Sequence, residues 1–125
     1  MAIELNHTIV PASDKMRSAQ FLTELLGLPE PASFGPFRIV QIGSLSLDFM
    51  DYGDAAITPM HYAFLVGEDD FDAIFGRIQA RGLDYWADPH HQEPGTINHH
   101  DGGRGVYWND PDGHVLEIIT RPYGG

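Results

Sequence analysis

The chain has 125 residues, with 18 Asp and Glu against 7 Lys and Arg and no Cys, which is the length of one domain and excludes disulfides, thiolate metal sites and a Cys nucleophile. Its net charge of -11 argues against a nucleic-acid partner, because phosphates need cationic contacts, and is compatible with a metal ion, a cationic ligand or simple solubility. No apolar run approaches the roughly 18 residues of a membrane span, and the N-terminus lacks the pattern of a signal peptide, so we expect a cytoplasmic protein without a membrane partner.

The first half of the chain predicts a strand, a helix and a hairpin, in that order. The expected elements are a strand at residues 5–10, a helix capped by Ser13 or Asp14 and ended by Gly27, a Pro-rich turn at 29–36, and strands at 37–43 and 45–52. A tight turn at Gly43-Ser44 joins the last two strands into a hairpin. Alternation in the first strand puts His7 on the same face as Leu5 and Ile9.

After a linker at residues 53–59, the second half begins the same pattern again. The expected elements are a strand at 60–67, a helix capped by Asp69 or Asp70 and ended by Gly82, a strand at 83–89, a polar stretch from 88 to 103, and strands at 105–109 and 114–120. The helix has an apolar stripe formed by Phe71, Ile74, Phe75 and Ile78.

The two halves form an internal repeat. The strand histidine and the glycine that ends the helix are 20 residues apart in the first half, counted from His7, and 21 in the second, counted from His61. Aligning the ends of the halves places Asp48 opposite Glu117. We therefore expect one α+β domain, residues 1–125, built from two βαβββ modules at 1–55 and 56–125 with mainly antiparallel sheets.

Three strands each carry one polar residue among apolar neighbours, namely His7, His61 and Glu117. A buried carboxylate is costly unless it is paired or binds a metal. Two imidazoles and one carboxylate make a facial triad that suits Fe(II), and also Mn, Ni, Co or Zn. Asp48 is the fourth residue related by the repeat, and its position allows a fourth ligand, a base outside the metal shell, or an exposed edge residue.

The whole chain resembles the vicinal oxygen chelate superfamily, which includes glyoxalase I, fosfomycin-resistance transferases, bleomycin-binding proteins and type I extradiol dioxygenases. The resemblance rests on the repeat, on LNHTIV and MHYAFLV at the starts of the two halves, and on YWNDPDGHVLEIIT at the end. It implies an eight-stranded open cup, a small-molecule substrate, and a divalent metal held by His7, His61 and Glu117. It also implies a homodimer, in which the halves of a cup sometimes come from different chains.

The stretch from residue 99 to residue 117 is similar to the closing signature of the extradiol dioxygenases. His100, or equally His99, stands at the start of that pattern, Tyr107 in its middle, and the ligand Glu117 at its end. The resemblance implies that the histidine and Tyr107 line the pocket and hydrogen-bond a catechol-like substrate or bound oxygen. An Fe(II) dioxygenase acting on such a substrate is therefore the first functional expectation.

The chain also departs from that pattern. It is less than half the length of the two-domain dioxygenases, and the helix-side catalytic histidine of those enzymes has no obvious match. His90 and His91 are candidates to replace it, although they fall on a stretch expected to be an exposed loop. His114 faces away from Glu117 by strand parity, so we expect it to lie outside the site.

Two other classes of function fit the same fold. A glyoxalase-type lyase or isomerase would use Asp48 as a fourth metal ligand. Both this type and a fosfomycin-type transferase need cationic side chains to bind an anionic substrate, and the chain has only seven Lys and Arg residues. A non-catalytic protein resembling the bleomycin-binding family would use the acidic charge and an aromatic groove. The aromatic candidates for that groove are Phe49, Tyr85, Trp86, Tyr107 and Trp108.

Overall fold

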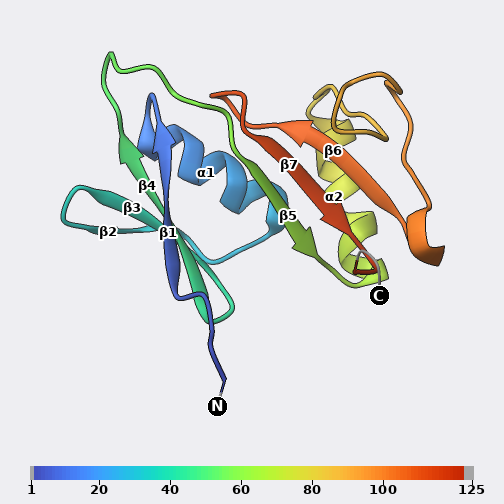
Figure 1. Ribbon diagram of the computed structural model, residues 1–125, viewed down its shortest axis with the longest axis horizontal. Helices are drawn as coiled ribbons and strands as arrows, with labels where there is room; N and C mark the ends of the chain where they lie inside the picture. The colour runs from blue at the N-terminus through green and yellow to red at the C-terminus, as the bar shows by residue number, and fades with distance from the viewer. Residues whose placement is uncertain (1, 123–125) are drawn as a thin grey trace. The chain divides into compact units, whose positions relative to one another are not determined.

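A computed structural model describes residues 2–122 of the chain (Figure 1). The chain divides into two compact units, Met1–Thr58 and Pro59–Gly125, each with its own sheet and one long helix. This architecture confirms the α+β fold class. Among the described residues, neither helix is long and apolar enough to cross a bilayer.

The first unit is a four-stranded sheet with one helix. Its elements are β1 (His7–Ala12), α1 (Lys15–Leu26), β2 (Ala32–Phe34), β3 (Phe37–Ile42) and β4 (Leu45–Asp51), and the strand order is β1-β4-β3-β2. Strand β1 runs parallel to β4, while the other two pairs are antiparallel. Strand β2 corrects the sequence prediction, which assigned its residues to a turn; the segment pairs with β3 along three residues.

Helix α1 covers one face of this sheet and leaves the other face open. It packs against β1, β3 and β4, and the sheet face that carries Val10, Leu47 and Phe49 is buried. Side chains alternate along a strand, so His7 and Asp48 lie on the opposite face. Helix α1 therefore provides the core of the unit without covering the candidate site residues.

The second unit is a three-stranded sheet with one long helix. Its elements are β5 (His61–Leu65), α2 (Glu68–Ala80), the short 3-10 helix η1 (His100–Gly102), β6 (Gly105–Asn109) and β7 (Val115–Ile119), and the strand order is β5-β7-β6. Strand β5 is parallel to the central strand β7, and β6 is antiparallel to it. The apolar stripe of α2 is buried at Phe71, Ile74 and Ile78, as are Val106, Trp108, Leu116 and Ile118 on one face of the sheet.

The strand predicted at residues 83–89 does not form, so the second unit has three strands, and the described residues contain seven where the implied cup has eight. Only Trp86 pairs in this segment, through bridges to Tyr107 and Pro94. Pro94 has no N–H to extend a ladder. Immediately after the bridge, the Asp88 carboxylate accepts hydrogen bonds from the backbone N–H groups of His90, Gln92 and Glu93, which turns the chain away.

The predicted cap of α2 is also wrong. The helix begins two residues earlier than a cap at Asp69 would allow, with Gly67 at the N-cap and no side-chain cap hydrogen bond. Asp69 and Asp70 instead lie in the first turn, where a carboxylate interacts favourably with the helix dipole. In α1, by contrast, Asp14 is the N-cap and accepts hydrogen bonds from the N–H groups of Met16 and Arg17, while Gly27 ends the helix with a φ of 69°.

The strand registers of the two units are equivalent. In the first unit Ile9 pairs with Asp48, and in the second Ala63 pairs with Glu117. His7 and His61 each precede the paired residue by two positions, so each lies on the same face as the carboxylate of its own unit. The alignment of Asp48 with Glu117 deduced from the repeat is thus present in the hydrogen-bonded sheets.

We expect Asp14→Ala to lower the free energy of unfolding by about 1 kcal/mol, because two N–H groups of α1 lose their side-chain acceptor. Asp70→Ala is the matched control at the start of α2, and at 0.15 M salt it should cost at most about 0.5 kcal/mol, because only a screened dipole interaction is lost. Urea unfolding followed by circular dichroism measures both. Equal losses in the two variants would contradict the difference between the caps.

Candidate functional site

The central feature of the second unit is the carboxylate of Glu117 in the middle of the central strand β7. Its side chain is 0% exposed. Leu116 and Ile118 face the helix-covered side of the sheet, so Glu117 points to the opposite face. There it lies in register with Tyr107 of β6 and Ala63 of β5. An ionised carboxylate at such a position requires polar or cationic partners.

His61 is oriented by the backbone toward this carboxylate. Its Nδ1 lies 3.1 Å from the carbonyl oxygen of Val115, and its Nε2 lies 3.0 Å from Oε1 of Glu117. A carbonyl only accepts, so Nδ1 carries the hydrogen and donates. A neutral imidazole then directs the Nε2 lone pair at a carboxylate oxygen, and two acceptors meet. A proton or a metal cation between them makes this contact attractive.

The donor set fits a divalent metal ion. Imidazole nitrogen and carboxylate oxygen both bind such ions at about 2.1 Å, and two ligand atoms at right angles are then about 3.0 Å apart, which is the separation of His61 Nε2 from Glu117 Oε1. A carbonyl that fixes the second imidazole nitrogen is typical of a metal-binding histidine. Residues 2–122 contain no gathered group of three or more His, Asp or Glu side chains that could hold a metal ion. His61 and Glu117 thus offer two ligands.

Tyr107 borders the pair formed by His61 and Glu117. It is buried, it pairs directly with Glu117 across β6 and β7, and its ring stacks with that of His61, with centroids 6.0 Å apart and an angle of 24°. Cross-strand neighbours on one face have Cβ atoms about 5 Å apart. The phenol therefore belongs to the same small surface as the imidazole and the carboxylate.

In the first unit, His7 and Asp48 lie on the face of the sheet that is opposite to α1. His7 is exposed, and its Nδ1 lies 2.8 Å from Oδ1 of Asn6. Asp48 is largely buried and accepts a hydrogen bond of 2.8 Å from the Ser46 hydroxyl. The apolar neighbours of His7, Leu5 and Ile9, are 68% and 45% exposed, so within the described structure His7 lies on an exposed face and not in a core.

His99 and His100 lie at the surface, on the loop that precedes β6. The backbone N–H of His100 donates to the side chain of Asn98, which also donates to the carbonyl of Ala87. Asn98 thereby anchors the loop beside the bridge that it forms with Gly105. The two imidazoles are exposed, whereas Tyr107 is buried, so the structure does not gather them into one cluster.

His114 has a structural role, in agreement with its predicted orientation away from Glu117. Its side chain is fully buried, its Nδ1 accepts the backbone N–H of Met60, and its ring meets Tyr62 edge-on. The Asp110 carboxylate accepts the backbone N–H of His114. Burial raises the pKa of Asp110 above its usual value, although this hydrogen bond acts in the opposite direction. This cluster holds β5 to the turn before β7.

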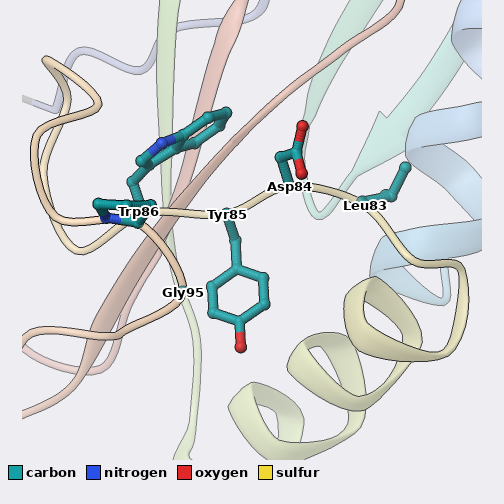
Figure 2. Close-up of a pocket in the computed structure, with 6 residues that line it drawn as sticks. Leu83, Asp84, Tyr85, Trp86 and Gly95 are labelled. Atoms are coloured by element: carbon teal, nitrogen blue, oxygen red, sulfur yellow. The ribbon is translucent and has the colours of Figure 1, made fainter.

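A second aromatic cluster contains Trp86, which the sequence predicted as a groove residue, and His91, which it did not. The ring of Trp86 stacks on that of His91, with centroids 3.6 Å apart and an angle of 12°. Figure 2 shows the side chains of Asp84 and Trp86 on one side of their segment and that of Tyr85 on the other. A cavity of about 320 Å³ is lined by Leu83, Asp84, Tyr85, Trp86, Pro94 and Gly95. Strand alternation in residues 83–86 could have placed the Trp86 side chain on one face of its segment. The position of His91 could not be predicted in this way, because the loop that carries it has no periodic pattern.

The protein belongs to the class of α+β folds built from two tandem modules. In each module the first strand is parallel to the strand that carries the carboxylate, and Asp48 and Glu117 have the same register position. Residues 4–118 match the Glyoxalase/Bleomycin resistance protein/Dioxygenase superfamily. The chain therefore belongs to this superfamily, as its resemblance to vicinal oxygen chelate proteins predicted.

The chain is similar to solved structures and to a curated enzyme. The structure of Oxidase ChaP-H1 is 64% identical with a TM-score of 0.95, and the match covers 99% of this chain and 100% of that chain. For Oxidase ChaP-H2 the identity is 61%, the TM-score 0.96 and the coverage 100% and 98%. Glutathione transferase FosA of Serratia marcescens is 31% identical over 94% of this chain and 81% of that protein.

We expect His114→Ala to lower the free energy of unfolding by about 2 to 3 kcal/mol, because it removes a buried ring and the acceptor of the Met60 N–H. His90→Ala, on the exposed loop, is the matched control and should change stability by less than about 0.5 kcal/mol. Thermal unfolding with a fluorescent dye and urea titration measure both. A His114→Ala variant as stable as His90→Ala would show that the buried cluster does not support β5.

Proposed function

We propose that the protein is a divalent-metal-dependent oxidoreductase of the extradiol dioxygenase type that acts on a small, catechol-like chelating substrate. The observation that carries this proposal is the contact of His61 Nε2 with the buried carboxylate of Glu117, with Nδ1 held by a backbone carbonyl. The names of the two oxidases that are more than 60% identical to this chain support an oxidation.

In this proposal His7, His61 and Glu117 hold the metal, with Fe(II) favoured over Mn, Ni, Co or Zn. When bound, Fe(II) supplies the redox chemistry that allows O2 to react with a chelated diol. His7 belongs to the first unit, so it would join the other two ligands from the same chain or from a second chain of the proposed homodimer. Mixing the inactive variants His7→Ala and Glu117→Gln distinguishes these cases, because activity returns only if the ligands come from different chains.

The other site residues are proposed to act on protons and on substrate position. Tyr107 lies beside Glu117, so its hydroxyl would donate a hydrogen bond to a substrate oxygen held there. His99 or His100 would accept a proton from the diol, because a neutral imidazole has a nitrogen lone pair that can act as a general base. Asp48, already hydrogen-bonded to Ser46, would be a base beside the metal ligands or a fourth ligand.

A glutathione-transferase activity is the second candidate, favoured by the 31% identity to FosA. Such a reaction requires cationic side chains around an anionic substrate. Arg104 is instead paired with Glu68 and Asp72 of α2, and Lys15 contacts Asp51 and a backbone carbonyl. Loss of glutathione thiol in the presence of an epoxide and Mn(II) would support the transferase. If the same protein takes up no O2 with diols, the oxidoreductase proposal is wrong.

We expect His7→Ala, His61→Ala and Glu117→Gln each to lower iron affinity by at least about tenfold, since each removes a proposed ligand. Protein purified without oxygen is analysed for metal content and titrated with Fe(II). His90→Ala is the control, because it changes an exposed imidazole far along the chain from the proposed ligands. If wild-type protein holds no more metal than the three variants, the metal-dependent function is wrong.

With Fe(II) bound, Tyr107→Phe should reduce the turnover number for O2 uptake with catechol by about tenfold to a hundredfold, because a hydrogen bond to the reacting oxygens is lost. One of His99→Ala and His100→Ala should reduce it by about a hundredfold, the scale of a lost acid–base group. Tyr62→Phe, on the opposite face of β5, is the control. Unchanged turnover in Tyr107→Phe, or in both histidine variants, would contradict the corresponding role.

A further inference from the structure

Trp86 continues a row of side chains that begins at the candidate metal site. The backbone N–H and C=O of Trp86 both bond to Tyr107, each at 2.9 Å, and Tyr107 in turn pairs with Glu117. Directly paired residues in antiparallel segments project from the same face. Trp86, Tyr107 and Glu117 therefore lie in this order across the sheet, on the face that α2 leaves uncovered.

The length of this row sets the size of a ligand that could span it. Neighbouring strands are roughly 4.8 Å apart, so Trp86 lies two strand spacings, or about 10 Å, from Glu117. A diol bound through both oxygens beside Glu117 needs more than one ring to reach the indole. A cavity of about 320 Å³ is lined in part by Trp86, together with its neighbours in residues 83–85 and with Pro94 and Gly95.

His91 occupies the face of the indole in a position that a ligand ring could take. Its imidazole lies parallel to the indole at 3.6 Å, the arrangement of a stacked aromatic ligand. The residue is exposed and has a φ of 59°, in the left-handed region that few residues other than glycine adopt. Hydrogen bonds from neighbouring N–H groups to Asp88 hold the loop in this conformation. The stack is thus a contact made by a strained surface loop.

We propose that Trp86 is a specificity-determining platform for the second ring of a fused aromatic diol, and that His91 covers the indole until the substrate displaces it. The inference rests on the proposed function, since the row is measured from the metal site. It narrows the substrate class from catechols in general to planar polycyclic diols. Trp86 positions the substrate and takes no part in the chemistry.

The test compares two diols that differ by one ring, catechol and naphthalene-2,3-diol, by calorimetry with Zn(II)-loaded protein, which binds without turnover. Trp86→Leu should weaken the binding of naphthalene-2,3-diol about threefold to tenfold, the scale of a lost aromatic stacking contact. The dissociation constant of catechol should stay within about twofold of the wild-type value. Trp86→Phe keeps an aromatic ring and should retain part of the preference, and it serves as the test variant if Trp86→Leu does not fold. Steady-state KM values with Fe(II) should follow the same pattern while turnover numbers stay constant.

His91→Asn tests the cover, because asparagine tolerates the left-handed conformation but has no ring to stack. We expect it to strengthen the binding of naphthalene-2,3-diol by about twofold to fivefold without changing that of catechol. Weaker binding of the larger diol in this variant would overturn the covering role of His91. The ratio of the dissociation constants of catechol and naphthalene-2,3-diol measures the preference for the second ring. If this ratio is the same in wild type and in both Trp86 variants, the proposed role of Trp86 is wrong.

A third probe separates this inference from the proposed function. 2-Naphthol has a second ring but cannot chelate a metal, so its binding does not require the metal site. If wild type consumes O2 with catechol while Trp86→Leu leaves the binding of both naphthalene compounds unchanged, the platform is wrong and the function stands. If the diols show no metal-dependent binding but Trp86→Leu weakens 2-naphthol, the function is wrong and the platform stands.

Discussion

Burial of one carboxylate in the centre of a three-stranded sheet is the constraint on which the site depends. Glu117 on β7 is fully buried, and desolvation of a carboxylate costs several kcal/mol unless a cation or hydrogen-bond donors compensate. The surrounding arrangement brings an imidazole to the carboxylate: the Val115 carbonyl lies 3.1 Å from Nδ1 of His61, and Nε2 of the same ring lies 3.0 Å from Oε1 of Glu117. A proton or a cation between Nε2 and Oε1 makes the contact of this pair attractive.

Strand parity explains why part of this site was predictable from sequence. Glu117 is recognisable in the sequence because it is the one charged residue in an apolar strand. His61 is recognisable because the first strand of each half carries a histidine, His7 in the first half and His61 in the second. Pairing of Tyr107 with Glu117 follows from a short turn between two strands. The helices were predictable for a similar reason, because an apolar stripe and Gly27 define α1.

The remaining features depend on interactions that leave no periodic pattern. Strand β2 is three residues long, so its pairing with β3 has no recognisable alternation. The segment around Trp86 alternates like a strand, but the Asp88 carboxylate collects three backbone N–H groups and ends the pairing. The stack of His91 on Trp86 arises from that turn. No periodic pattern predicts this stack, because a local turn, and not strand alternation, brings the two rings together.

The two units have the same register but different chemistry at the equivalent carboxylates. Asp48 is one methylene shorter than Glu117 and receives the hydroxyl of Ser46, whereas Glu117 faces the imidazole of His61. The residue two positions before each carboxylate therefore differs in function: Ser46 offers a side-chain donor, and Val115 offers a backbone carbonyl that orients an imidazole. A hydroxyl donor stabilises a carboxylate without a cation, so Asp48 has less need of a metal than Glu117 has. In the proposed metal site, this asymmetry favours a base over a fourth ligand for Asp48, because three protein ligands would leave coordination positions for a chelating substrate.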